Sequence, residues 1–376
     1  MPAGWSISDP LPQEALMRRR TFVSLILPVT ALFLWGCQVD RPLEVSHTDP
    51  ALLARQPSSS QFATLITLPA LGNRNPSEAL AVNRSGTVIA GYAWEPKGTL
   101  RAVKWTPQAG GSWAITVLPL AAAATGANAR AVNDAGDVGG NDFPATNPHA
   151  TLWPASGGFN TLGCDDTGEV YSMTAGAQVL AGIHRVSGAA MPALWRPGSC
   201  REDLPVLTPG GGAFVMAVNA DGTIVGGGAG FPLRWTRVGG VWNVEQLDQR
   251  SGTVRAANAD GDLAGQVSVS CAQSSGCTRA IIWYSNGGMR ELGTLGGADS
   301  WARGINASGE IVGLSTPSAG TNTGFFWSES SGIVALPVNG RWAAANAISD
   351  VRADGTRLVV GMDSRGTPIA WVVRNP

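Results

Sequence analysis

The sequence predicts an all-β fold made of repeats about 44 residues long, and three observations support this prediction. Tryptophans recur at spacings of 40 to 48 residues, each at the end of a short apolar run. A five-residue cassette recurs upstream of each of them. Short apolar runs alternate with Gly-rich turns and show no 3.6-residue periodicity, which is typical of strands rather than helices. The seven tryptophans are Trp105, Trp153, Trp195, Trp235, Trp283, Trp327 and Trp371.

Each cassette contains a small residue or valine, a variable residue, a small residue, an apolar residue and then Asn, Ser or Thr. A turn and a second apolar run follow it, and after each tryptophan except the last a further turn leads to a run ending in leucine. One repeat therefore supplies four short strands. The Asn-x-x-Gly elements suit hairpin turns, because Asn and Gly tolerate positive φ. The seven cassettes cover residues 79–83, 129–133, 170–174, 215–219, 254–258, 302–306 and 345–349.

Four strands per repeat, seven times, predict a seven-bladed β-propeller of four-stranded blades over residues 61–376. Only five residues follow Trp371, so the seventh repeat lacks its last strand, whereas residues 62–68 supply a spare one. We expect the propeller to close by pairing 62–68 with the last repeat, which removes an exposed sheet edge. An elongated β-solenoid is the alternative, but it does not need complementary ends. The small cassette residues suit crowded inner strands, and the tryptophans are expected to pack between blades.

The N-terminus carries a predicted export signal over residues 1–36, with the natural start at Met17. Three arginines precede an uncharged 15-residue run, as in a secretory signal. The segment 34–37, Leu-Trp-Gly-Cys, resembles the lipobox of bacterial lipoproteins, although Trp35 replaces the usual small residue. The resemblance implies cleavage before Cys37 and lipidation of its thiol, and a plain secreted protein is the alternative.

Residues 37–60 are then the lipidated cysteine and a polar, flexible tether. Gln38 is not the aspartate of an inner-membrane retention signal. We therefore expect an outer-membrane or cell-surface lipoprotein that meets the membrane only through its anchor, with a secreted or periplasmic protein as the alternative.

The four remaining cysteines are expected to form disulfides, because an exported protein meets an oxidising compartment. Cys271 and Cys277 lie in one apparent hairpin and are predicted to pair, which leaves Cys164 with Cys200. A zinc site is disfavoured, because the cysteines lack CxxC spacing and have no histidine nearby.

Composition and motifs argue against several functions. A net charge of −1, from 26 basic and 27 acidic residues, disfavours nucleic-acid binding. The three histidines, His47, His149 and His184, accompany no GxSxG, HExxH or Walker motif, so no catalytic residue is predicted. The densest acidic group, Asp165, Asp166 and Glu169, is interpreted as a solvated loop.

Calcium is the one cofactor for which the sequence contains possible ligands. The turns at 219–222 and 258–262 hold Asn and Asp oxygens close together, as calcium sites do. Their glycine falls one place early for a calcium loop and no distal Glu follows, so we predict no metal and no cofactor.

The variable cassette position supplies the candidate ligand site. It is occupied by Leu80, Arg130, Tyr171, Met216, Arg255, Arg303 and Asn346. In a propeller this strand lines the central channel, where guanidinium groups can hold an anion with Tyr171 as a stacking or hydroxyl partner. The predicted ligand-binding residues are Arg130, Tyr171, Arg255, Arg303 and Asn346.

Two considerations oppose this ligand site. Strict strand alternation places the variable residue on the same face as the apolar residue after it. The arginines can instead pair with local acids such as Glu78 or Asp299.

The segment 292–327, LGTLGGADSWARGINASGEIVGLSTPSAGTNTGFFW, resembles the bacterial extracellular HAF-repeat family. That family runs Leu-Gly-x-Leu-Gly-Gly, then Gly-Ile-Asn-x-x-Gly-x-Val-Val-Gly, then His-Ala-Phe-x-Trp. The resemblance covers about residues 62–373, but the His-Ala-Phe triplet is degenerate and the third and seventh repeats lack the Asn-x-x-Gly spacing. It implies an exported repeat protein, and the family has no agreed activity.

These observations predict a monomeric, non-enzymatic binding module at the bacterial cell envelope. Its partner is expected to be a protein or a carbohydrate, and not nucleic acid. A purely scaffolding role is not separated from this prediction by the sequence. The alternative is a lyase or hydrolase of envelope polysaccharides with its site in the channel, which requires a buried channel carboxylate beside an arginine.

Overall fold

The computed structural model describes residues 62–72, 76–145, 147–163, 167–186, 188–208, 211–271 and 274–374. Every secondary-structure element of these residues is a β-strand, which confirms the all-β prediction. No helix in this part of the chain is long and apolar enough to cross a bilayer. The predicted signal, Cys37 and the tether lie outside the described residues.

The first six repeats each contribute four consecutive antiparallel strands, and the seventh contributes three. The first repeat forms β2 (Ser77–Val82), β3 (Ile89–Trp94), β4 (Leu100–Pro107) and β5 (Trp113–Val117). The second forms β6 (Ala124–Val132), β7 (Val138–Pro144), β8 (His149–Trp153) and β9 (Asn160–Thr161). The third forms β10 (Glu169–Met173), β11 (Leu180–Val186), β12 (Ala189–Trp195) and β13 (Glu202–Asp203).

The later repeats follow the same order. The fourth forms β14 (Phe214–Val218), β15 (Ile224–Gly228), β16 (Pro232–Val238) and β17 (Val241–Gln246). The fifth forms β18 (Gly252–Ala257), β19 (Leu263–Cys271), β20 (Ser274–Trp283) and β21 (Met289–Glu291). The sixth forms β22 (Gly296–Ile305), β23 (Ile311–Pro317), β24 (Thr323–Ser328) and β25 (Gly332–Ala335). The seventh forms β26 (Ala343–Ile348), β27 (Arg357–Asp363) and β28 (Pro368–Val373).

The strand missing from the seventh repeat comes from the segment 62–68. This segment forms β1 (Ala63–Thr67), which pairs antiparallel with β28 from Ala63 opposite Val373 to Thr67 opposite Ile369. The resulting sheet has the order β1-β28-β27-β26. A strand from one end of the repeats thus completes the sheet at the other end.

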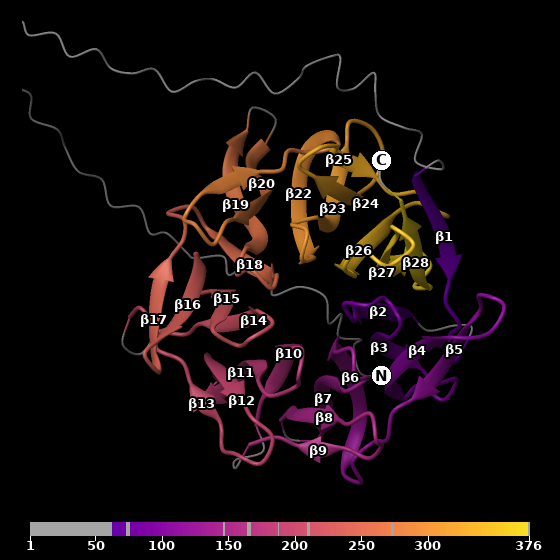
Figure 1. Ribbon diagram of the computed structural model, residues 1–376, viewed down its shortest axis with the longest axis vertical. Coiled ribbons are helices and arrows are strands. Elements are labelled where there is room, and N and C mark those ends of the chain that lie inside the picture. Colours follow the sequence, from indigo (N-terminus) through magenta and orange to yellow (C-terminus); the bar gives the residue numbers. More distant parts are fainter. Residues whose placement is uncertain are drawn as a thin grey trace, which may run out of the picture. The chain divides into compact units, whose positions relative to one another are not determined.

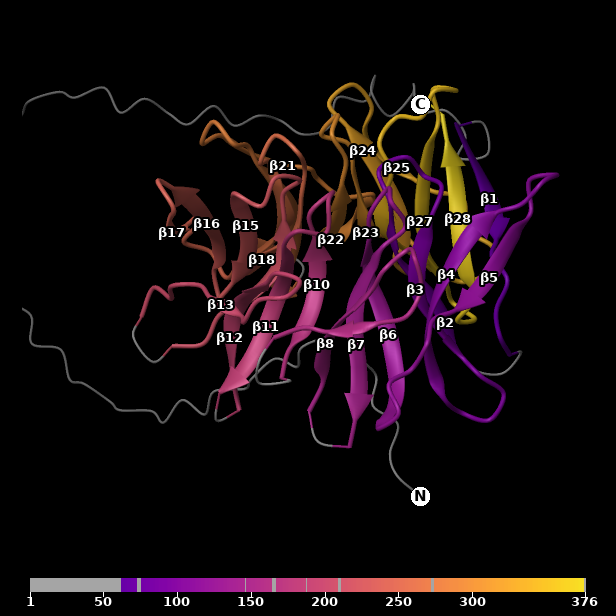
Figure 2. The ribbon, with the colours of Figure 1, turned by 60° about the horizontal axis from the view of Figure 1, so that its bottom comes forward.

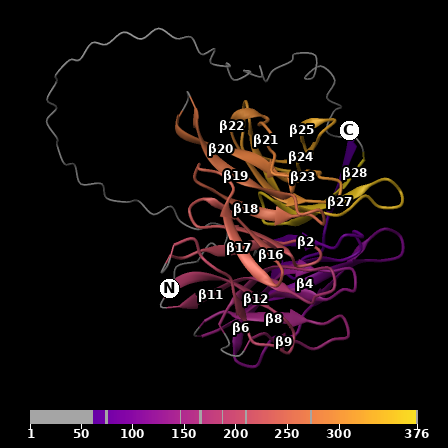
Figure 3. The same cartoon turned by 60° about the vertical axis from the view of Figure 1, so that its left-hand side comes forward.

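The sheets are arranged around a central axis (Figure 1). The first strand of each repeat lies nearest the axis and the last lies at the rim, as the positions of β2 and β5 show. Neighbouring sheets stand side by side in the other two views (Figures 2 and 3). Strand β2 contacts β26 and β27, so the first repeat packs against the seventh.

The repeated tryptophans are the packing units between sheets, as predicted. All seven are buried, with at most 2% of their surface exposed. Trp105 packs with Val103 of its own repeat and with Leu358 and Val360 of the seventh. Four of the indoles also donate a hydrogen bond to a proline carbonyl at the end of the preceding rim strand, as Trp371 does to Pro337 O at 2.7 Å.

The last cassette residue is polar because its side chain closes the following hairpin. The Asn83 Oδ1 accepts hydrogen bonds from the backbone N–H of Thr87 and Val88 at 2.8 and 2.9 Å. In the third repeat Thr174 replaces Asn and accepts from Val179 N, and the turn there places Ala177 in the left-handed region at φ 53°. The changed sequence spacing therefore alters the turn and keeps the polar cap.

The disulfide between Cys271 and Cys277 joins β19 and β20, which confirms that prediction. Cys164 lies outside the described residues, so its pairing with Cys200 stays a prediction.

Candidate functional site

A β-bulge interrupts the innermost strand of every repeat at the same cassette position. In the first repeat Ala79 lies opposite Gly91 and Ala81 opposite Ala90, so Leu80 is an extra residue on β2. The same register shift recurs in all seven repeats. The bulged residues are Leu80, Arg130, Tyr171, Met216, Arg255, Arg303 and Asn346, which are the seven variable positions of the cassettes.

A glycine on the second strand accommodates each bulge. A Cβ on Gly91 would lie 2.0 Å from the carbonyl oxygen of Glu78 on β2, far inside a normal contact. The equivalent distance in all seven repeats is 1.8 to 2.1 Å. Only glycine leaves room for the bulged strand to approach this closely. The seven glycines are Gly91, Gly140, Gly182, Gly227, Gly265, Gly313 and Gly361.

The bulges direct all seven variable side chains into one central cavity of about 230 Å³. Strict alternation would place each variable side chain on the same face as the apolar residue that follows it in the cassette. This expectation is wrong, because the extra residue of the bulge breaks the two-residue period. The five predicted ligand-binding residues therefore lie together.

Small residues form the cavity wall below the bulges, as expected for crowded inner strands. Ala81, Ala217 and Gly304 are three of them. At Gly304 a Cβ would lie 2.9 Å from the Cα of Ala347 on the next repeat, so these inner strands approach closely. The cavity continues to the hairpin turns that follow the cassettes.

Arg130 is held against an aromatic ring. Its guanidinium carbon lies 4.9 Å from the centroid of the Tyr171 ring, a cation–π distance. The Tyr171 hydroxyl donates to Glu169 Oε2 at 2.8 Å, and Arg185 donates to the other Glu169 oxygen at 3.3 Å. Burial raises the pKa of the Tyr171 hydroxyl, the Glu169 carboxylate raises it further and Arg130 opposes both. Tyr171 is therefore a neutral phenol that faces the Arg130 guanidinium.

A second chain of contacts holds Arg303. Its Nη1 donates to Asn346 Oδ1 at 2.8 Å, and Asn346 Nδ2 donates to Glu78 Oε1 at 2.9 Å. The Tyr92 hydroxyl donates to the other Glu78 oxygen at 2.9 Å. Asn346 thus links Arg303 to Glu78. Asp299, the other acid considered as an arginine partner, accepts from the backbone N–H of Thr278.

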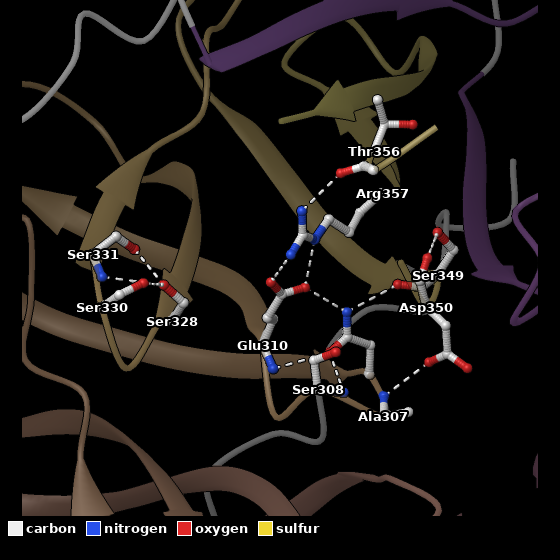
Figure 4. Close-up of polar contacts among 12 residues, drawn as sticks. Ala307, Ser308, Glu310, Ser328, Ser330, Ser331, Ser349, Asp350, Thr356 and Arg357 are labelled. Carbon is white, nitrogen blue, oxygen red and sulfur yellow. Dashed lines mark hydrogen bonds and ion pairs between the residues drawn. The ribbon is translucent and has the colours of Figure 1, made fainter. Parts of the chain in front are cut away.

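A row of polar contacts joins the hairpin turns that follow the cassettes of the sixth, seventh and first repeats. Glu310 and Arg357, each 6% exposed, form an ion pair with Nε and Oε2 2.8 Å apart (Figure 4). Asp350 accepts from Ala307 N on one side and pairs with Arg84 at 2.8 Å on the other. These contacts link the sixth repeat to the seventh and the seventh to the first.

Several other titratable groups form contacts within their own turns and sheets. His149 Nδ1 lies 3.4 Å from Asp142 Oδ1, and His184 Nε2 lies 3.1 Å from Asp203 Oδ1. Asp221, in one of the turns considered for calcium, accepts from Thr223, and this hydrogen bond lowers the pKa of its carboxyl. Among the described residues, no three His, Cys, Asp or Glu side chains are grouped so as to hold a metal ion.

The supporting acids Glu78 and Glu169 were missed by sequence reasoning as parts of the site. Glu78 was considered only as a direct arginine partner, and Glu169 only as part of a loop cluster whose other two residues, Asp165 and Asp166, lie outside the described residues. A sequence signal did exist, because each acid stands two residues before a bulged position. It acquires meaning only once the bulge is known.

No protein-family model and no curated protein matches the chain. The β-propeller domain of the Trilobed protease from Pyrococcus furiosus is similar with a TM-score of 0.52 and 10% identity, over 83% of this chain and 93% of that domain. Streptogramin B lyase is similar with a TM-score of 0.52 and 8% identity, over 85% of this chain and 100% of the lyase.

A third similar structure, TolB from Acinetobacter baumannii, has a TM-score of 0.43 and 12% identity over 77% of this chain. The chain spans 64% of that protein, less than two thirds of its length. At 10% and 8% identity, the similarity to the protease domain and to the lyase establishes fold and not activity. The fold of this chain is a β-propeller.

Proposed function

We propose that this chain is an exported, lipid-anchored, seven-bladed β-propeller that acts as a binding module at the bacterial cell envelope. Its ligand site is the central cavity. The pairing of β1 with β28 and the packing of β2 on β26 support a closed ring. Deleting Ala63–Thr67 tests the closure, because it exposes the edge of β28 and is expected to promote association.

One observation carries the binding function. Seven bulges bring seven side chains of five different types into one cavity, while the glycine opposite each bulge is the same in every repeat. A position needed only for packing would be held to small or apolar residues, as its neighbours are. Bulges are over-represented next to functional sites, where they re-aim a side chain.

The cavity suits a small ligand or the end of a larger one. Its volume of about 230 Å³ lies below the roughly 300–1,000 Å³ of pockets that enclose drug-sized molecules. A terminal sugar or a terminal peptide residue is of the right size, so the partner is an envelope carbohydrate or protein.

Binding has more support than catalysis. Among the described acids, those that line the cavity are Asp134 and Asp350, and each accepts a backbone N–H at the turn level. A channel lyase or hydrolase needs a buried carboxylate beside an arginine, whereas Asp350, which pairs with Arg84, is only partly buried. Glu78 stands behind Asn346 instead.

The envelope location rests on the predicted signal and on Cys37. Growth with an alkyne-tagged fatty acid is expected to label the full chain, and Cys37→Ala is expected to abolish the label. A label that persists in the variant would contradict lipidation at this cysteine.

Thermal unfolding of the full chain in detergent tests the ligand site. The probes are glucose, N-acetylglucosamine, glucuronate and trialanine, and a ligand at 100 times its Kd adds about 2.7 kcal/mol, which corresponds to roughly 5 °C. The double variant Leu80→Tyr, Met216→Tyr narrows the cavity with a side chain that already occupies the same position at Tyr171. The matched control is Val238→Tyr, at a side chain that is 63% exposed on the β16–β17 hairpin.

A stabilisation seen in the wild type and the control but lost in the narrowed variant supports the channel site. Equal stabilisation of all three proteins would place the ligand elsewhere. No stabilisation by any probe would argue against a small-ligand site in the channel.

A further inference from the structure

We propose that the β16–β17 hairpin of the fourth repeat inserts its tip into the surface of the lipid bilayer to which the chain is anchored. The tip consists of residues 238–241, Val-Gly-Gly-Val. This inference rests on the proposed lipid anchor, because the anchor brings the hairpin to the membrane. It adds a second membrane contact to the anchor that the sequence predicts, and it is independent of the ligand in the channel.

The most exposed apolar side chains of the described residues lie in two neighbouring repeats. Val241 and Val238 are 65% and 63% exposed, the highest values among the large apolar side chains described, and they lie opposite each other across the hairpin. Met289 is next at 54%, and it begins β21 in the corresponding hairpin of the fifth repeat. Exposed apolar side chains that gather in this way are typical of a surface that contacts a protein or a membrane.

The hairpin lies on the face of the propeller at which the chain enters it. Successive strands of each sheet are antiparallel, so the turn after the first strand and the hairpin between the third and fourth strands share one face, the turn face. Strand β1 takes the place of the fourth strand in the seventh sheet and begins at Ala63. The chain therefore enters the propeller at the turn face, which also carries Val238 and Val241.

An anchor at Cys37 leaves the hairpin within reach of the bilayer. Residues 38–61 separate Cys37 from Phe62 and span at most about 80 Å when extended. Four strands about 4.8 Å apart make each sheet about 15 Å deep, so this length exceeds the distance across the propeller. An anchor within reach raises the effective concentration of the hairpin at the bilayer to about the millimolar range. A contact too weak to hold a free protein is then sufficient.

The tip leaves few backbone groups without a hydrogen-bond partner on insertion. It is a two-residue turn with Gly239 and Gly240 at φ 59° and 86°, and Val238 pairs with Val241 across it. Arg237 Nε also donates to the Gly240 carbonyl at 3.4 Å. A shallow insertion keeps the remaining N–H and C=O groups at the hydrated interface, so the cost of burying unpaired backbone is small.

The side chains next to the tip suit the membrane interface. The Arg237 guanidinium carbon lies 5.7 Å from the centroid of the Trp242 ring, and Trp242 Nε1 donates to Glu202 Oε1 at 3.0 Å. Tryptophan is enriched at membrane interfaces, where its ring meets apolar surface and its N–H stays hydrated. Arg237 also lies 3.9 Å from Glu202, and on the neighbouring hairpin Arg290 pairs with Glu329. Because these charges are paired, we expect apolar area rather than anionic lipid to drive the contact.

Fluorescence of the lipidated full chain in vesicles of uncharged phosphatidylcholine tests the insertion. A nitrobenzoxadiazole dye is attached at Val241→Cys, or at the matched control Val186→Cys, which is 51% exposed at the end of β11 on the opposite face. The wild type treated with the same dye gives the background from the native cysteines. We expect the dye at position 241 to shift its emission to shorter wavelength and to be quenched by spin-labelled lipid, whereas the dye at position 186 reports water.

Serine variants test whether the two valines drive the contact. With the dye at Met289→Cys, the double variant Val238→Ser, Val241→Ser is expected to lower the ratio of docked to free protein about 10- to 100-fold, because two valine side chains no longer leave water. The matched control, Val186→Ser with Leu207→Ser, changes two exposed apolar side chains of the opposite face and is expected to leave this ratio unchanged. All four side chains are exposed, so neither pair is expected to alter folding.

The inference is overturned if lipid quenches the dye at position 241 no more than at position 186, or if the serine variant of the hairpin is quenched like the control. Serine variants that abolish self-association of the chain in detergent, and not the membrane contact, would assign the hairpin to an interface between copies. A lipidated chain whose hairpin stays in water would refute the inference and leave the anchor and the channel site standing. A chain that carries no lipid would count against both the anchor and the inference.

Discussion

Replacing Gly182 with alanine tests whether the glycine opposite each bulge determines the site. Gly182 on β11 faces the bulge that carries Tyr171, and its added Cβ would lie 1.8 Å from the carbonyl oxygen of Glu169. Ordinary carbon–oxygen contacts are about 3.3 Å. The two strands must therefore separate by about 1.5 Å at this point.

A shift of this size costs both hydrogen bonds and packing. Opening the ladder beside the bulge weakens about two backbone hydrogen bonds, each worth about 1 kcal/mol, and overpacking adds about 1 kcal/mol or more. We expect Gly182→Ala to lower the free energy of unfolding by about 3 kcal/mol and the Tm by about 6 °C. Tyr171 also moves away from Arg130, so the ring contact between them is lost in the folded variant.

The matched control is Gly324→Ala in the buried strand β24. A Cβ there would meet its nearest neighbours, Leu336 and Ala345, at 3.4 to 3.5 Å, which is ordinary contact. We expect a change within about 1 kcal/mol, because alanine also restricts the unfolded chain. Urea unfolding followed by tryptophan fluorescence measures both variants. Equal stability of the two would refute the idea that the close approach requires glycine.

Three further predictions concern the frame around the channel. In urea unfolding, Trp371→Phe is expected to lower the free energy of unfolding by about 1 kcal/mol more than Trp195→Phe does. The Trp371 indole donates a hydrogen bond to a proline carbonyl, whereas the buried Trp195 Nε1 has no hydrogen-bond partner among the described residues. Arg357→Met is expected to lower the free energy of unfolding by about 3 kcal/mol, because it removes the arginine partner of the buried Glu310 carboxylate. Adding Glu310→Leu should restore most of this loss of stability. Burial alone would raise the pKa of Asp363, but hydrogen bonds from Arg365 and Thr367 oppose burial and lower the pKa below its usual value. The ionised carboxylate therefore stabilises the fold above about pH 4, and this contribution is lost as the pH falls. Asp363→Asn should therefore flatten the fall in Tm between about pH 4 and pH 2, and an unchanged slope would contradict this assignment.

The repeat architecture could be predicted from the sequence because each of its features has a local cause. The tryptophan spacing, the small cassette residues and the spare segment 62–68 each reflect packing or pairing that recurs in every repeat. The polar residue that ends the cassette is the cap of the next hairpin, as Asn83 and Thr174 show. Such signals survive in a single sequence because the chain repeats them.

The bulges were not predicted, although their signal was present. A residue that departs from strict alternation cannot be recognised from the pattern of one strand. The glycine that faces it, such as Gly91 or Gly361, stands at the same place in each second strand, yet a glycine in a strand has several explanations. Only the register of both strands shows that the variable residue and the glycine belong to one feature.

The contacts that orient the site were beyond sequence reasoning for a different reason. Asn346 joins Arg303 of the preceding repeat to Glu78 of the first repeat, residues separated by more than 200 positions in the chain. Nothing local in the sequence relates them, because their proximity comes from the packing of the first repeat against the seventh.

In each repeat the glycine opposite the bulge allows the close approach of the two inner strands, whereas the bulged residue lines the cavity. The glycine admits the bulge through a close backbone contact, so the pairing of the two strands does not depend on which side chain is bulged. Leucine, arginine, tyrosine, methionine and asparagine all occupy the position in one chain. Positions such as Leu80 and Met216 can therefore change without altering the strands that carry them, whereas Tyr171, Arg303 and Asn346 also hold hydrogen bonds or ring contacts. Exchanging Leu80 and Met216 should alter the cavity at little cost in stability, whereas the same exchanges one residue further along, at Ala81 or Gly304, should disrupt the fold.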